Sequence, residues 1–176
     1  MGNDKTNPDK KSVIHLGTFD FSGKGPGTYA GGTFKLFSNQ KEDLLESAKS
    51  FLAAADRCLN SNKVENGIEI LVVPGTVCAA FACELFLKYI LFIENGEIVR
   101  GHQLDALFRK CSKEIQSDLI KARTDILEIL KRDNEQFIEA RYHHESNVAS
   151  FREQEVLQVA ELLSRFVGTR FSGGAT

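Results

Sequence analysis

One long apolar stretch, Ile70–Ile93, constrains the fold of this chain more than any other feature of its sequence. Pro74 suits the first turn of a helix and Glu94-Asn95-Gly96 suits a helix end, so the stretch predicts a helix over 74–93. Its large side chains fall on every side of that helix: Val77, Cys78, Phe81, Leu85, Phe86, Tyr89, Ile90 and Phe92. A helix that is apolar all round is buried by its own domain, so we expect this helix at the centre of the fold.

A membrane span is the alternative for a stretch of this length. Glu84 and Lys88 lie within it, and each charge would cost roughly 2.5–3.5 kcal/mol near the centre of a bilayer. The chain has 176 residues, of which 42% are hydrophobic and 26% charged, as is usual for one globular domain. We therefore expect a buried core helix and no membrane association.

Apolar residues recur at helical spacing in further segments on both sides of the central helix. They predict helices at 38–59, 101–111, 112–130 and 152–167, with another helical turn or two at 134–145. Ser112 is the expected N-cap of the 112–130 helix. Asn66-Gly67 predicts a turn before the short β-branched run Ile68–Val73. The expected fold is all-α, an antiparallel bundle of about five helices over residues 38–168.

The two ends of the chain differ from the bundle in composition. Residues 1–37 predict a flexible glycine-rich arm, and residues 169–176 a frayed tail. The arm contains Lys24 after a glycine, but Gly25-Pro26 follows where a phosphate-binding loop needs a serine or threonine that opens a helix. We therefore expect no phosphate loop in the arm.

Charge and cysteine usage narrow the class of protein. The net charge of −2 and the pI near 6.1 do not predict general attraction to nucleic acid. The first twelve residues are polar and lack the apolar region of a secretory signal. Cys58, Cys78, Cys83 and Cys111 lack the spacing of zinc ligands. We expect four buried, reduced thiols in a cytoplasmic protein that needs no metal or cofactor.

A few polar residues stand out because they lie in or beside apolar segments. Glu84 and Lys88 are one turn apart on the central helix, and His102 begins the next helix. Each has a structural interpretation, a buried pair or a helix-end contact, and a functional one, a site that faces a cleft. Since buried polar groups need partners, we predict that Glu84 contacts Lys88, His102 or Arg141.

The densest polar cluster is Arg141-Tyr142-His143-His144-Glu145. An arginine beside a histidine suits phosphodiester chemistry, in which the arginine binds phosphate and the histidine transfers protons. It suits a surface helix end equally well. Adjacent histidines point about 100° apart on a helix, so His143 and His144 do not predict a shared metal.

Three segments together resemble the HEPN superfamily. They are Ala79–Leu91 with its Glu84-Leu85-Phe86-Leu87-Lys88 core, then Gly101-His102-Gln103-Leu104, then Phe137 to Glu145 with Arg141-Tyr142. The resemblance covers roughly Leu44–Phe166. It implies a small helical bundle that usually dimerises and that recurs in antiviral defence and toxin–antitoxin systems of prokaryotes.

The resemblance also implies ribonuclease activity in many members, through an arginine followed by four to six residues and then a histidine. No arginine of this chain has a histidine at that spacing. The first hypothesis is therefore a binding and dimerisation module that acts with a protein partner from the same gene neighbourhood. The second is a metal-independent endoribonuclease with a degenerate site at His102, Arg141 and His144, and RNA or a nucleotide as ligand. A structural network of Glu84, Lys88, His102, Arg141, Tyr142 and Glu145 fits either one, and whether the protein is an enzyme stays open.

Overall fold

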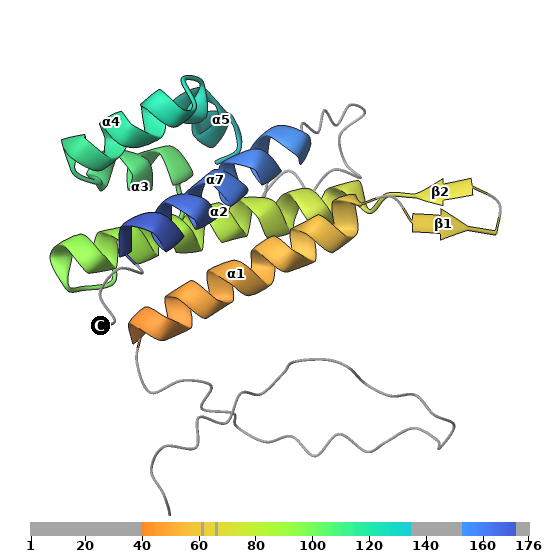
Figure 1. The fold of residues 1–176 in the computed structure, drawn as a ribbon, viewed down its shortest axis with the longest axis horizontal. Helices are drawn as coiled ribbons and strands as arrows, with labels where there is room; N and C mark the ends of the chain where they lie inside the picture. The colour runs from red at the N-terminus through yellow and green to blue at the C-terminus, as the bar shows by residue number, and fades with distance from the viewer. Residues whose placement is uncertain (1–39, 61, 66, 135–152, 172–176) are drawn as a thin grey trace, which may run out of the picture. The chain divides into compact units, whose positions relative to one another are not determined.

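The computed structural model describes residues 40–60, 62–65, 67–134 and 153–171 (Figure 1). These residues form six α-helices and one short hairpin. They are α1 (Gln40–Leu59), β1 (Asn62–Val64), β2 (Gly67–Glu69), α2 (Val72–Asn95), α3 (Leu104–Lys110), α4 (Lys113–Ala122), α5 (Ile126–Arg132) and α7 (Glu153–Phe171). The expected all-α fold is confirmed.

Helix α2 lies at the centre, as its apolar surface predicts. It packs against α1, α3 and α7 (Figure 1). Phe86, Leu87, Ile90 and Leu91 are completely buried. By length and composition alone α2 could cross a membrane, but most of its apolar stretch is buried among the other helices. Burial in the bundle therefore accounts for the feature that could otherwise suggest a membrane span.

Helices α1 and α2 run antiparallel and are joined by the β1–β2 hairpin (Figure 1). The rings of Phe51 and Phe81 meet edge to face with their centroids 4.5 Å apart. Near the hairpin the two helices approach so closely that a Cβ at Gly75 would lie 2.6 Å from the Leu59 side chain. The sequence predicted the turn at Asn66-Gly67 but not the antiparallel strands on either side of it.

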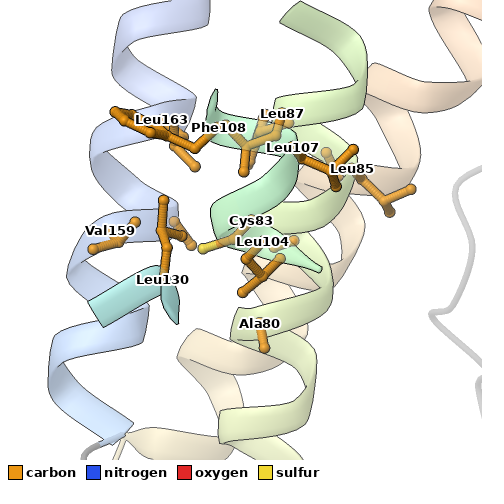
Figure 2. Close-up of a cluster of buried hydrophobic side chains, with 14 of the residues drawn as sticks. Ala80, Cys83, Leu85, Leu87, Leu104, Leu107, Phe108, Leu130, Val159 and Leu163 are labelled. Carbon is orange, nitrogen blue, oxygen red and sulfur yellow. The ribbon is translucent and has the colours of Figure 1, made fainter. Parts of the chain in front are cut away.

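Figure 2 shows the part of the hydrophobic core where side chains of α3, α5 and α7 gather beside α2. Cys83 and Leu87 of α2 meet side chains from the other three helices in this cluster. Those side chains are Leu104, Leu107 and Phe108 of α3, Leu130 of α5, and Val159 and Leu163 of α7. Contacts of Cys83 with Val156 and of Tyr89 with Phe171 show that α7 runs in the same direction as α2. Helix α1 is thus antiparallel to both α2 and α7, whereas α2 and α7 are parallel, which corrects the expectation of a fully antiparallel bundle.

The expected helix at 112–130 is two helices. Ser112 caps α4 as predicted, since its hydroxyl accepts from the Ile115 N–H at 3.4 Å. Arg123 is extended (φ −150°, ψ 106°) and ends α4. Its guanidinium donates to Asp125 at 2.9 Å and to Gln158 of α7 at 2.7 Å, which fixes the break. This correction raises the number of helices among the described residues above the expected five.

Several helix ends also differ from expectation, and α2 is longer by a half-turn at each end, Val72–Asn95 rather than 74–93. Helix α3 begins at Leu104 rather than at Gly101-His102, because Gly101 has a φ of +118°, which no helix contains. Helix α7 continues to Phe171, past the expected end at 167–168, because the Phe171 ring packs on Tyr89 and Phe166. The expected arm at 1–37, the turns at 135–145 and residues 172–176 of the tail lie outside the described residues.

Candidate functional site

The polar centre of the bundle is the Glu84 carboxylate. Glu84 lies in the middle of α2, and only 9% of its side chain is exposed. Lys88, one turn later and 12% exposed, donates to its Oε1 at 2.7 Å. Glu before Lys at this spacing is the favourable order on a helix. The pair is nearly desolvated, so each charge depends on the other for its stability.

His102 meets the same carboxylate from the loop before α3. Its Nδ1 lies 3.0 Å from Glu84 Oε1, although 83% of its side chain is exposed. The positive φ of Gly101 turns the chain back over α2 and allows this contact. Two groups therefore converge on one oxygen of a buried acid, one from inside the helix and one from the surface.

This arrangement can orient an imidazole. An Nδ1 that donates to the carboxylate carries the proton in the neutral ring, which leaves Nε2 as an acceptor. The exposed ring then presents Nε2 to solvent, as a general base or a hydrogen-bonding group must. The structure thus brings Glu84, Lys88 and His102 together. Two of the three contacts that the sequence offered for Glu84 are present.

Arg141, Tyr142, His144 and Glu145 lie outside the described residues. Within the described ranges, no group of three or more His, Cys, Asp or Glu side chains could hold a metal ion.

A second polar cluster, which the sequence did not reveal, joins the end of α5 to the start of α7. Asp133 is buried, with 1% of its side chain exposed, and Arg132 donates to its two oxygens at 3.3 and 3.2 Å. Arg132 also donates to Glu155 of α7 at 2.6 Å. No spacing in the sequence distinguishes Asp133 from a surface aspartate, so pattern reasoning had no signal for it.

Asn134 extends this cluster to α3. Its Nδ2 donates to Asp105 Oδ1 at 2.6 Å, and its Oδ1 accepts from the Asp105 N–H at 3.2 Å. The end of α5 is thus tied both to the first turn of α3 and to α7. These contacts anchor the residues on each side of the segment that carries Arg141.

The cysteines differ from one another in burial. Cys83 and Cys111 are buried as expected, and desolvation raises the pKa of both thiols, that of Cys111 to about 12. Cys58 and Cys78 are only half-buried, which corrects the expectation of four buried thiols. All four are free.

Comparison with known proteins gives one family and one similar fold. The family model described as "HEPN domain" matches residues 41–170. The crystal structure of TT1696 from Thermus thermophilus superposes with a TM-score of 0.55 at 22% identity, covering 74% of this chain and 98% of that one. At this identity the likeness concerns the fold alone. A search of curated proteins found no significant match.

Proposed function

Because this chain belongs to the HEPN domain family, which its match over residues 41–170 shows, we propose that it is a helical binding module without catalysis of its own. We propose that it forms a homodimer in the cytoplasm and acts with a protein partner encoded nearby, in prokaryotic defence or stress response. The proposed ligand is RNA or a nucleotide.

One observation carries this proposal: the acid–base groups that the structure describes at its polar centre are engaged with each other. Glu84 binds Lys88 and His102 through a single oxygen. In the sequence, no arginine precedes a histidine at the spacing typical of the family's ribonucleases. Losing one partner of a buried ion pair leaves an uncompensated charge, so the fold needs Glu84 and Lys88 together whether or not a substrate is present.

The experiment for this proposal uses the purified full-length chain. Light scattering coupled to size exclusion measures its mass, and co-expression with the products of adjacent genes tests for a stable complex. We expect a dimer, a co-purifying partner and no change in total RNA incubated with the protein and EDTA. A monomer that binds none of the neighbouring products would contradict the proposal.

The second candidate function is a metal-independent endoribonuclease. It is favoured by His102, whose exposed ring is oriented by a buried carboxylate, as general-base histidines often are. If the protein is such a ribonuclease, we expect it to cleave RNA in the presence of EDTA, and we expect His102→Ala and Arg141→Ala each to abolish cleavage. Arg109→Ala is the matched control, because Arg109 is an exposed arginine on α3 that should not affect cleavage.

A further inference from the structure

The half-buried cysteines Cys58 and Cys78 lie on facing helices, α1 and α2. They differ from Cys83 and Cys111, which are buried. The proposed function uses neither of them.

The end of α1 is held directly over the first turns of α2. The Cys58 carbonyl accepts from the Leu71 N–H at 2.8 Å. A Cβ at Gly75 would lie 3.1 Å from the Cβ of Cys58. Cys58 thus lies over Gly75, beside the Leu59 side chain, which would be 2.6 Å from the same Cβ.

Cys78 follows Gly75 by three residues and so lies on the same face of α2, about 5–6 Å further along. The thiols are near enough to interact electrostatically: burial, and then the neighbouring Cys58, raise the pKa of the Cys78 thiol. A disulfide needs Cβ atoms about 3.5–4.5 Å apart and Cα atoms within about 6.8 Å. Cys58 is the penultimate residue of α1, so any shift that the bond requires falls on the last turn of that helix.

We propose that Cys58 and Cys78 are a thiol pair that a peroxide oxidises to a disulfide, which ties α1 to α2 at the base of the β1–β2 hairpin. The Cys58 thiolate attacks one peroxide oxygen, the O–O bond breaks, and a sulfenic acid and water form. The Cys78 sulfur then displaces the hydroxyl from the Cys58 sulfur, and a second water leaves. Both sulfurs are oxidised, and one hydrogen peroxide is reduced to two waters.

Cys58 is assigned the first step because the raised pKa of Cys78 lowers its thiolate fraction. Cys83 and Cys111 are too buried to meet a dissolved oxidant in the folded protein. The reaction should therefore stop at one disulfide, and a thiol reductant should reverse it.

The test uses the full-length, reduced protein treated with dilute hydrogen peroxide and then with an alkylating reagent. We expect the free thiols to fall from four to two and the intact mass to fall by two hydrogens. After trypsin, peptide 58–63 should be joined to peptide 64–88. Because 64–88 also contains Cys83, fragmentation must place the bond at Cys78.

Matched variants separate the pair from general oxidation. Cys58→Ser should keep all three remaining thiols. Cys78→Ser should keep two, because Cys58 stops at the sulfenic acid when no partner thiol can resolve it. Cys111→Ala should still lose two thiols to the disulfide. Wild-type protein oxidised in urea should give mixed pairings, which shows that the folded state selects the bond. A bond from Cys58 to Cys83, a bond between two chains, or four intact thiols under conditions that oxidise the unfolded protein would overturn the proposal.

Discussion

Replacing Glu84 with glutamine tests whether the polar centre of α2 stabilises the fold. The substitution keeps the size and shape of the side chain but removes its charge. The Lys88 ammonium then stays in a position where only 12% of its side chain is exposed, with no carboxylate beside it.

The magnitude follows from the geometry of the pair. At 2.7 Å, and with the effective dielectric constant of about 20 that suits protein sites, the attraction is about 6 kcal/mol. Part of it offsets the desolvation of two charges. The loss of one partner from a buried pair typically costs about 3–5 kcal/mol, since the remaining charge is uncompensated. For a chain of this length that lowers Tm by about 6–20 °C.

Urea unfolding followed by circular dichroism is the assay, because a shift in midpoint at constant slope reports stability alone. The matched control is Glu46→Gln. Glu46 pairs with Lys49 at 2.8 Å, but these side chains are 47% and 52% exposed, so the expected cost is below about 1 kcal/mol. The double variant Glu84→Gln/Lys88→Met should recover most of the loss, because no buried charge remains unpaired.

The reasoning is refuted if Glu84→Gln and Glu46→Gln shift the midpoint equally. It is also refuted if Lys88→Met lowers the stability of Glu84→Gln by as much as it lowers the stability of the wild type. The two substitutions would then act independently.

Gly75→Ala should destabilise by about 1–3 kcal/mol in urea unfolding, because its Cβ would press on Leu59 at 2.6 Å. Gly168→Ala in α7 should instead stabilise the protein by up to about 1 kcal/mol, because its Cβ would meet nothing within 4 Å. A stabilising Gly75→Ala together with a destabilising Gly168→Ala would contradict the packing described for these two helices. His102→Ala should change the unfolding free energy by less than about 1 kcal/mol, because the ring is 83% exposed; a larger loss would make it a core contact. Phe86→Ala should cost about 3–5 kcal/mol by the same measurement, since the ring is completely buried, and a cost near that of His102→Ala would place it outside the core.

Structural features that depend on residues near one another in the chain were predictable from the sequence. Helix α2 is apolar on all sides, so its position at the centre followed from composition alone. Ser112 was recognisable because a cap is a contact between near neighbours in the chain. The Glu84–Lys88 pair was likewise set by the helical repeat.

Features fixed by contacts between distant residues were not predictable. Leu119 and Ile126 continue a helical spacing across the break between α4 and α5, and both are completely buried. The break itself depends on Arg123 and its bond to Gln158, which lies 35 residues later. A periodic pattern contains no information about such a bond.

The candidate site shows the same division. His102 was singled out by its place after a glycine, but its return to Glu84 depends on the φ of Gly101, which the sequence does not specify. The burial of Asp133 depends on how α5 meets its neighbours. Pattern reasoning therefore found the residues on α2 and missed the cluster at the end of α5.

The unequal connections between the packed helices predict the order in which the chain folds. Residues 60–71 join α1 to α2, whereas residues 96–152, a connection nearly five times longer, separate α2 from α7. Closing the longer loop costs about 1.4 kcal/mol more in chain entropy. The α1–α2 pair should thus form the folding nucleus, and α7 should dock after the transition state. Core substitutions in α7 will then mainly speed unfolding, while substitutions between α1 and α2 slow folding.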